Sequence, residues 1–472
     1  MGNGWRVAVV GGGIAGLAAA VRLRDAAPAG TTVTVFEQSG SLGGKLRTGE
    51  LAGSPVELGA EAFLVRDAAT GEDSPAVRLA RRLGLGDELV NPAVGAAALA
   101  VDGRLVPVPR GTLTGVPGDL DAVRDVARVA ADRDLDAGRP LLAPGTDVAV
   151  GELVRRRLGD QVVDRLVDPM LGGVYAGRAD RLSLAATMPA LARQARVEGT
   201  LTGAVKAAQA AFPRVPGGAV FATVRGGVSR LVSAAVAVAG AEIRLGATVR
   251  EITPDGAGWR LTVGPTRDPE FVAADAVVLA VPARPAGRLL ADVDAEAARA
   301  VGVLDYASVA LVAMALPSPD LPEISGFLVP AEAGTSVKAA TFFTTKWAHL
   351  RRPDGVALVR ASVGRHGEEH VLQRDDADLA RAVHTELSAL LGTALPAPLD
   401  TRVQRWGGAL PQYAPGHLDR VAAARAALAA RHPTLALAGA GYDGVGIPVC
   451  VRSGEAAADA VLAALAEPPA AG

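Results

Sequence analysis

Two segments at opposite ends of the chain share one pattern of apolar and polar residues. Near the start, the apolar run from Val7 to Val10 precedes a glycine-rich turn and a helical stretch from Leu17 to Arg24. More than 400 residues later, "LALAGAGYDGVGIPVCVRSGEAAADAV" has the same order of apolar run, glycine turn and alanine-rich stretch. Short, wholly apolar runs are typical of parallel strands that are buried on both faces. The pattern predicts two strand–turn–helix units.

Further segments predict the same kind of α/β structure. "TTVTVFE" predicts a second strand that ends at Glu37. "VPGGAVFATVRGGVSRLVSAAVAVAGAEIRLGATVREI" predicts a strand-like piece, a glycine turn, a helix from about Ser229 to Ala239 and a strand that ends near Val249. "ADAVVLAVPA" predicts one more buried strand, closed by Pro282.

The middle of the chain has a different period. From about Leu113 to Ala211, apolar residues recur at spacings of three and four with charges between them, which predicts helices. Asp147 is placed to cap a helix that begins near Val150. A second helix is expected from Asp160 to Met170, ending in the turn Gly172-Gly173.

Length, charge and cysteine content narrow the class of protein. A chain of 472 residues is long enough for two or three domains. The longest stretch without a charge is the 15 residues between Arg6 and Arg22, whereas a membrane span needs about 20. We therefore expect a cytoplasmic, water-soluble protein whose contact with a membrane is at most peripheral.

The single cysteine, Cys450, excludes an internal disulfide framework and a cysteine-based zinc site. A formal charge of −2 gives no electrostatic reason to expect nucleic acid. His366 and His370 are spaced like the histidines of a zinc protease, but Gly367 stands where that motif needs glutamate, so no metal site is predicted.

The N-terminal turn carries the first candidate chemistry, a G-x-G-x-x-G motif made of Gly11, Gly12, Gly13, Ile14, Ala15 and Gly16. In a dinucleotide site, Gly11 forms the tight turn, Gly13 lets the backbone approach a pyrophosphate, and Gly16 allows close packing of helix on strand. The pyrophosphate then lies at the helix N-terminus. Glu37, 21 residues after Gly16, is placed to bind a ribose hydroxyl. An ordinary tight turn and a solvated strand end are the alternative interpretations.

The residues after Glu37 separate flavin from nicotinamide. Nicotinamide domains usually continue into another helix, whereas here "GSLGGKLRT", a short strand pair and "ELGAEAF" follow. This arrangement resembles the start of the flavin-containing amine oxidase superfamily. The resemblance implies FAD, with contacts from Gly44, Lys45, Gly59, Ala60, Glu61 and Ala62.

Four longer blocks narrow the resemblance further: "TDVAVGELVRRRLGDQVVDRLVDPMLGGVYAGRADRLS", "KAATFFTTKWAHLRRPDGVALVRASVGR", "RWGGALPQYAPGH" and "GAGYDGVGIPVCVRSG". In this order they resemble the oxygen-dependent protoporphyrinogen and coproporphyrinogen oxidases over nearly the whole chain. The resemblance implies that the Val249 backbone contacts the adenine end of FAD, and that Trp406 lies beside the isoalloxazine. It also brings the backbone of Val445, Gly446 and Ile447 against the flavin ring.

The fold implied is an α/β chain with a discontinuous Rossmann-like FAD-binding domain, a mixed α+β substrate domain and an inserted helical domain. The FAD-binding domain is expected at 1–85, 214–284 and 414–472. The substrate-binding domain is expected at 86–112 and 285–413, and the helical domain at 113–213.

The resemblance also implies a reaction: oxidation of a porphyrinogen, with O2 as acceptor and hydrogen peroxide as product. Eukaryotic members carry arginine in the turn that holds Glu61, so the Gram-positive branch, which uses coproporphyrinogen III, is favoured over protoporphyrinogen IX. Candidate cations for the propionates are Arg66, Arg178, Lys338 and Lys346, although a surface role is the simpler interpretation of each. A hand-over of product to ferrochelatase is a further expectation. An amine or carotenoid oxidoreductase, or a non-catalytic flavin-binding protein, remain alternatives.

Overall fold

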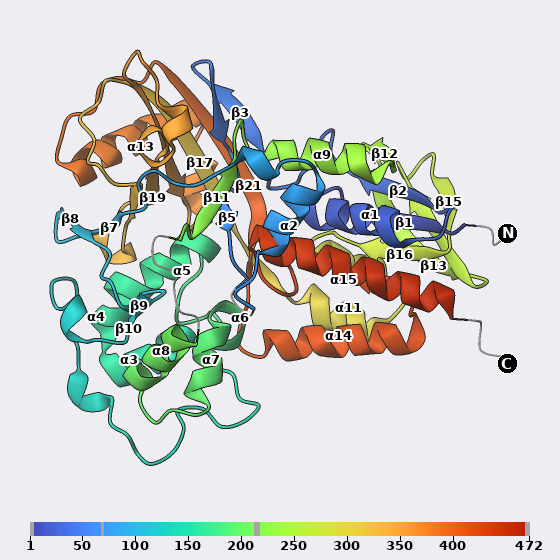
Figure 1. Cartoon of the computed structure of the whole chain (residues 1–472), viewed down its shortest axis with the longest axis horizontal. Coiled ribbons are helices and arrows are strands. Elements are labelled where there is room, and N and C mark those ends of the chain that lie inside the picture. The colour runs from blue at the N-terminus through green and yellow to red at the C-terminus, as the bar shows by residue number, and fades with distance from the viewer. Residues whose placement is uncertain (1–3, 68–69, 212–217, 468–472) are drawn as a thin grey trace.

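The computed structural model describes residues 4–67, 70–211 and 218–467. The molecule is elongated (Figure 1). The end near both termini holds a sheet packed between helices, and the other end holds a larger sheet beside a group of helices. This arrangement confirms the predicted α/β class with its Rossmann-like sheet and mixed second region.

The first sheet is parallel throughout and has the strand order β12-β2-β1-β16-β22. Its strands come from three separate parts of the chain, as predicted for a discontinuous domain. They are β1 (Arg6–Val10), β2 (Thr32–Glu37), β12 (Glu242–Leu245), β16 (Ala276–Leu279) and β22 (Leu435–Leu437). The two predicted strand–turn–helix units therefore lie in one sheet.

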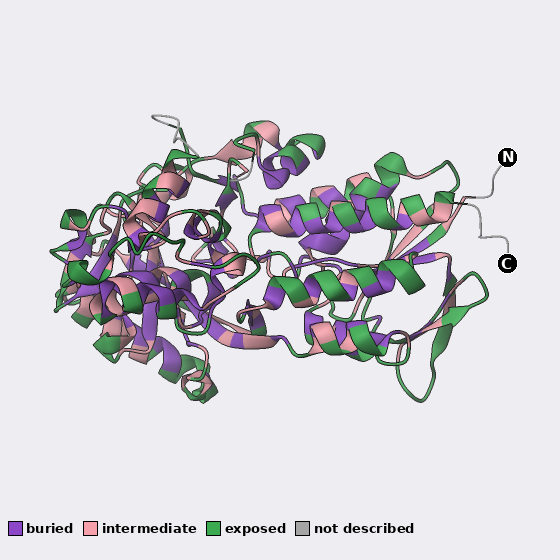
Figure 2. Cartoon of the chain, turned by 90° about the horizontal axis from the view of Figure 1, so that it is seen from below, coloured by how far each residue is buried: buried purple, intermediate pink, exposed green. Residues whose placement is uncertain are grey.

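Helices cover both faces of this sheet. Val7 and Val9 of β1 pack in the cluster formed with α1 (Ile14–Ala26), α9 (Ser229–Ala239) and α15 (Ile447–Ala466). Ala8 and Val10 belong to the cluster of the opposite face, where the helices are α10 (Ala283–Leu290), α11 (Ala295–Gly302) and α14 (His417–Arg431). Figure 2 shows the resulting division of these helices into buried inner sides and exposed outer sides.

The second sheet has seven strands in the order β21-β17-β20-β19-β18-β7-β8. Its strands are β7 (Ala97–Val101), β8 (Arg104–Pro107), β17 (Asp305–Pro317), β18 (Gly326–Leu328), β19 (Val337–Phe342), β20 (Val356–Val363) and β21 (Asp400–Gln412). Neighbours are antiparallel except β18 and β7. Helix α13 (Asp376–Leu391) covers one face of this sheet, and the other face borders the cavity described below.

The helical region begins later than predicted. Residues 114–149 hold no α-helix. This segment contains the short strand β10 (Val116–Pro117) and 3-10 turns at 121–123 and 131–133, and the strand β9 (Thr112–Leu113) lies directly before it. The apolar spacing is interrupted there by proline and glycine, which favour turns. The helices are α3 (Val150–Leu158), α4 (Asp160–Val162), α5 (Asp168–Tyr175), α6 (Leu184–Thr187), α7 (Pro189–Ala195) and α8 (Leu201–Ala210), with a π-helical turn at Val163–Val167.

Two local predictions in this region are wrong. Asp147 does not cap α3, because the N-cap of that helix is Ala149, which makes no side-chain bond. The Asp147 carboxylate accepts instead from the Ser183 hydroxyl at 2.6 Å and from the Gly416 N–H at 2.9 Å. The second helix runs through Gly172-Gly173 to Tyr175. A Cβ at Gly173 would lie 3.1 Å from the Leu328 side chain, so this glycine allows close packing of α5 on β18 and is not a turn residue.

The remaining described elements form two three-stranded antiparallel sheets, β5-β11-β6 and β13-β14-β15, and the β3-β4 hairpin, with two short helices. They are β3 (Thr48–Leu51), β4 (Ser54–Glu57), β5 (Phe63–Leu64), β6 (Leu89–Val90), β11 (Phe221–Val224), β13 (Val249–Asp255), β14 (Gly258–Val263), β15 (Glu270–Ala274), α2 (Pro75–Arg82) and α12 (Phe343–Lys346). Val249 therefore begins a strand, where the sequence predicted a strand end. The predicted domain boundaries stay predictions, and the one between 213 and 214 lies outside the described residues.

Candidate functional site

A cavity of about 2040 Å³ extends between the two sheets. Its lining includes residues of β1 and α1 on one side and of β17, β18, β19 and β20 on the other. Sites for one small ligand usually occupy roughly 300–1000 Å³. The volume therefore suits two ligands held side by side, such as a dinucleotide cofactor and a large substrate.

The N-terminal glycines form one end of this cavity. Gly11 has φ +111°, and a Cβ there would lie 2.6 Å from the Ala280 carbonyl oxygen. A Cβ at Gly16 would lie 2.0 Å from the Gly11 carbonyl oxygen, whereas one at Gly13 would meet nothing within 4 Å. Gly13 is also the N-cap of α1 and gives it no side-chain bond. The first N–H groups of α1 thus face open space, which fits a pyrophosphate.

Glu37 lies beside this turn with its carboxylate held by the backbone. The carboxylate accepts from the Gly12 N–H at 2.9 Å and the Ser39 N–H at 2.8 Å. The Glu37 carbonyl accepts from the Ala247 N–H at 2.9 Å, which brings the cavity-lining residue Val249 close to it. Of the motif residues, Gly12 and Gly16 are absent from the described lining, since Gly12 faces Leu42 and Gly16 packs against the turn.

The C-terminal unit reaches the same cavity. Helix α15 begins behind Gly446, which has no side-chain cap bond, and Val445, Gly446 and Ile447 line the cavity. Helices α1 and α15 lie side by side (Figure 1), and a Cβ at Gly454 would lie 2.0 Å from the Ala15 carbonyl oxygen. Two helix N-termini, each with a partial positive charge, therefore meet at one cavity.

The segment 59–62 and Trp406 form a third wall. The Ala60 N–H donates to the Lys45 carbonyl at 2.9 Å, and the Trp406 indole donates to the Leu58 carbonyl at 2.7 Å. A Cβ at Gly59 would lie 2.0 Å from the Lys45 carbonyl oxygen. The predicted contacts Gly44, Lys45, Ala60, Ala62 and Trp406 all line the cavity.

Glu61 joins two cations at this wall. Its side chain is 9% exposed and pairs with Lys346 Nζ at 2.8 Å and Arg360 at 2.9 Å, and it accepts from the Trp347 indole at 2.9 Å. Burial alone would raise the pKa of Glu61, but Lys346 and Arg360 more than offset it, so this pKa lies below its ordinary value. Lys346, predicted to meet a propionate, thus has a carboxylate partner within the protein.

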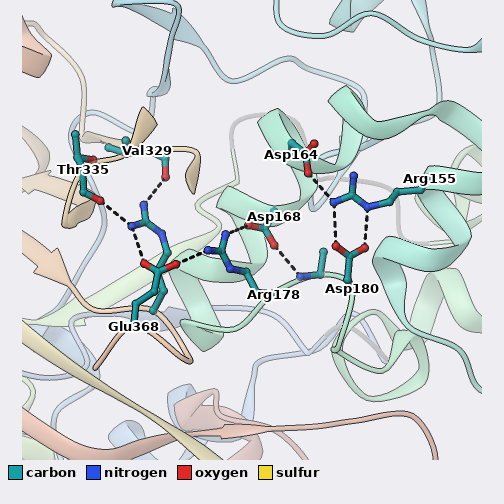
Figure 3. Close-up of polar contacts among 10 residues, drawn as sticks. Arg155, Asp164, Asp168, Arg178, Asp180, Val329, Thr335 and Glu368 are labelled. Carbon is teal, nitrogen blue, oxygen red and sulfur yellow. Dashed lines mark hydrogen bonds and ion pairs between the residues drawn. The ribbon is translucent and has the colours of Figure 1, made fainter. Parts of the chain in front are cut away.

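The other three predicted propionate contacts lie in different surroundings. Lys338 is buried and lines the cavity. Arg66 and Arg178 are not among the described lining residues. Arg66 pairs with Asp73 at 3.7 Å, and Arg178 pairs with Asp168 at 3.2 Å and with Glu368 (Figure 3).

Arg360 lines the cavity and was not singled out from the sequence. The only available signal was its place in the block "VRASVGR". Its guanidinium also donates to the Glu57 carbonyl at 2.7 Å and the Gly59 carbonyl at 3.1 Å, which fixes the segment that holds Glu61.

Cys450, which lines the cavity, and His366 give no sign of thiol or metal chemistry. Burial raises the pKa of Cys450 to about 11, so its thiol stays protonated. His366 contacts Asp305 at 2.7 Å, and the described residues include no cluster of His, Cys, Asp and Glu that could hold a metal. In the same described part of the chain, every helix is too short or too polar to cross a membrane.

Comparison with known proteins decides the family. The profile of flavin-containing amine oxidoreductases matches residues 14–462. The chain belongs to this flavin-containing amine oxidoreductase family. The flavin oxidoreductase is 38% identical to coproporphyrinogen III oxidase of Mycobacterium tuberculosis over 470 residues, covering 97% of each chain. It is 30% identical to coproporphyrinogen III oxidase of Bacillus subtilis over 476 residues, again covering 97% of each.

A solved structure gives the same result for the fold. The crystal structure of a candidate protoporphyrinogen oxidase from Exiguobacterium sp. 255-15 superposes with a TM-score of 0.83 at 31% identity, covering 98% of this chain and 99% of the other. The open space at Gly13, the two helix N-termini and the held carboxylate of Glu37 fit a flavin with a nucleotide tail.

A buried carboxylate near the cavity gives this flavin oxidoreductase a pH-dependent stability. Glu57 is 7% exposed, and burial raises its pKa from 4.5 to about 7. Because the folded state binds this proton more tightly than the unfolded state, stability falls as pH rises from about 4.5 to about 7 and stays lower above that. Glu57→Gln removes the charge and should raise the free energy of unfolding at pH 8 by on the order of 2–3 kcal/mol.

The gain should shrink toward zero as the pH falls toward 4.5, which denaturant unfolding at pH 8 and pH 5 will measure. Glutamine keeps an oxygen for the Val228 N–H, now 2.8 Å from the carboxylate. A gain of the same size at both pH values would contradict the assigned titration.

Proposed function

We propose that the chain is an FAD-dependent oxidase that converts coproporphyrinogen III to coproporphyrin III, with O2 as acceptor and hydrogen peroxide as product. Membership of the flavin family and the names of its relatives support an oxidoreductase acting on a tetrapyrrole. A cytoplasmic location and a transient hand-over of the product to ferrochelatase belong to the same proposal.

The surplus of positive charge in the cavity supports coproporphyrinogen III as the substrate. Its described lining holds eight cationic side chains against the two carboxylates of Glu37 and Glu61. The cations are Lys45, Arg47, Arg110, Arg250, Arg288, Lys338, Lys346 and Arg360. This surplus suits the diphosphate of FAD together with the four carboxylates of coproporphyrinogen III. Protoporphyrinogen IX, with two carboxylates, is the second candidate, and the name of the Exiguobacterium relative favours it.

The rest of the cavity suits the apolar macrocycle. Val309 and Leu311 of β17 and Leu328 of β18 line the sheet face, and Met170 and Val174 of α5 line the opposite side. The macrocycle would lie between these two surfaces, with its carboxylates at the cationic positions. Such a site orients the substrate and excludes water around the reacting carbons.

Bound FAD would accept hydride equivalents from the macrocycle and pass the electrons to O2. Six electrons and six protons leave one porphyrinogen, and three O2 become three hydrogen peroxide. Neither carboxylate of the described lining is free to act as a base, since Glu37 accepts two backbone N–H groups and Glu61 pairs with two cations. We infer that the pyrrole nitrogens of the substrate release the protons themselves.

A fluorescence assay tests the substrate choice. The purified yellow protein is given coproporphyrinogen III or protoporphyrinogen IX under air, and porphyrin fluorescence is corrected for autoxidation. We expect a higher kcat/KM for coproporphyrinogen III. A ten-fold preference for protoporphyrinogen IX would refute the substrate while leaving the oxidase, and rates equal to both blanks would refute the oxidase.

A further inference from the structure

A β-bulge turns Lys338 toward the cavity. On β19, Val337 pairs with Val363 and Ala339 pairs with Ser362, so no residue of β20 lies opposite Lys338. Val337 and Ala340 pack in the core beneath α13. On the opposite face, Lys338 reaches the Gly172 carbonyl of α5, and Ala339 pairs with Leu328, whose side chain packs against α5. Two consecutive residues share a face of a strand only where an extra residue is inserted. The bulge therefore gives this strand a cationic side chain directed into the cavity.

The Lys338 ammonium is buried without a counter-charge. It is 5% exposed, and its one hydrogen bond goes to the Gly172 carbonyl of α5 at 3.1 Å. The charged groups that influence the Lys338 ammonium are both cations: Arg360 on β20 and Arg365 on the loop that follows β20. The carboxylates of Asp168 and Glu368, on α5 and on that loop, are held by Arg178 (Figure 3). Within the described residues, no carboxylate pairs with Lys338.

An unpaired buried cation costs free energy that an anionic ligand can recover. Burial, with Arg365 and Arg360, lowers the pKa of Lys338 to about 7. A carboxylate placed beside the amine would raise this pKa again, since an opposite charge favours the protonated form. Binding of an anion above pH 7 should therefore take up a proton.

The composition of the chain makes this lysine unusual. Only four of the 48 basic residues are lysine, and Lys45, Lys338 and Lys346 all line the cavity. Lys346 is paired with Glu61, and Lys45 lies beside the segment 59–62. Unlike Lys346, Lys338 has no anionic partner in the described chain, and it lies on the side of the cavity where we place the substrate.

Sheet geometry separates Lys338 from the flavin end. Trp406 is on β21 and Lys338 on β19, three strands along in the order β21-β17-β20-β19. At about 4.8 Å per strand, the two positions are roughly 14 Å apart across the sheet. We infer that Lys338 binds one carboxylate of the tetrapyrrole at the end of the cavity remote from the flavin. The inference rests on the proposed function, whose substrate supplies that carboxylate.

Steady-state kinetics on the holoenzyme test this role. Lys338→Met removes the charge at similar length, Lys338→Arg keeps it, and Lys206→Met removes an exposed lysine of α8 outside the described lining as a control. With coproporphyrinogen III, Lys338→Met should raise KM about ten-fold or more while kcat changes less than about two-fold, because a charged contact is lost. Lys338→Arg should recover most of this loss, and Lys206→Met should match the wild type.

Calorimetry supplies a readout that a packing defect would not produce. Coproporphyrin III is titrated into the holoprotein at pH 8 in two buffers that differ in ionisation enthalpy. The wild type should take up close to one proton per ligand, and Lys338→Met should take up none. Wild-type KM and proton uptake in Lys338→Met would overturn the inference and leave the oxidase intact. Absence of both turnover and coproporphyrin binding in the wild type would overturn both proposals.

Discussion

Gly13→Val should give a folded protein that purifies without flavin. Gly13 has φ −74° and ψ 176°, which valine adopts readily, and a Cβ there meets nothing within 4 Å. The new side chain therefore fills only the space in which we place the pyrophosphate. Flavin absorbance per chain should fall below about one tenth of the wild-type value, because the blocked contacts are those that hold the phosphates.

Gly40→Val is the matched control. A Cβ at Gly40 also meets nothing within 4 Å, and Gly40 is not among the described residues that line the cavity. This variant should retain its flavin. Circular dichroism should show wild-type secondary structure for both variants. A fully flavinylated Gly13→Val protein would contradict the assigned pyrophosphate position.

Glu61→Gln should cause the largest loss of stability. The change leaves Lys346 and Arg360, which are 19% and 11% exposed, without their shared carboxylate. Removing one partner from a buried ion pair typically costs about 3–5 kcal/mol. Denaturant unfolding at pH 7 should show a loss of this order. Combining Glu61→Gln with Lys346→Met should recover part of it, because one of the two unpaired charges is then absent.

The same cluster predicts an acid-sensitive wild type. The pKa of Glu61 in the folded state lies below its ordinary value, so its contribution to stability is complete above that value and is lost as the pH falls through the lowered pKa. The difference between wild type and Glu61→Gln should therefore narrow under acid conditions. A difference that is absent at pH 7 would show that the cluster contributes no stability.

Much of the first sheet could be predicted because its signals are local. Short apolar runs marked β1 and β22 next to glycine turns and β16 before Pro282, and the helix expected at Ser229 to Ala239 is α9 as observed. The helical pattern before Val150 was misleading, since apolar spacing alone does not outweigh the turn preference of proline and glycine. The helix was expected to end in a turn at Gly172-Gly173 because the role of Gly173 is packing against Leu328, which depends on tertiary structure.

The site shows the same division between local and long-range information. The glycine motif and the residues around Gly446 could be placed because backbone geometry near a helix start follows from the sequence. The ion-pair partners of charged side chains could not be predicted from the sequence. Arg178 meets Glu368, 190 residues away, and Glu61 meets Arg360, 299 residues away. With 44 arginines in the chain, only the folded structure separates a cavity cation from an ion-paired surface cation.

If one cavity holds flavin and tetrapyrrole together, the macrocycle reduces the flavin directly. Mixing the yellow protein with coproporphyrinogen III in the absence of O2 tests it directly. The flavin absorbance should bleach as porphyrin fluorescence appears, and admitting O2 should restore the colour with release of hydrogen peroxide. Flavin that stays oxidised with coproporphyrinogen III, although dithionite still bleaches it, would contradict a shared site for the two ligands.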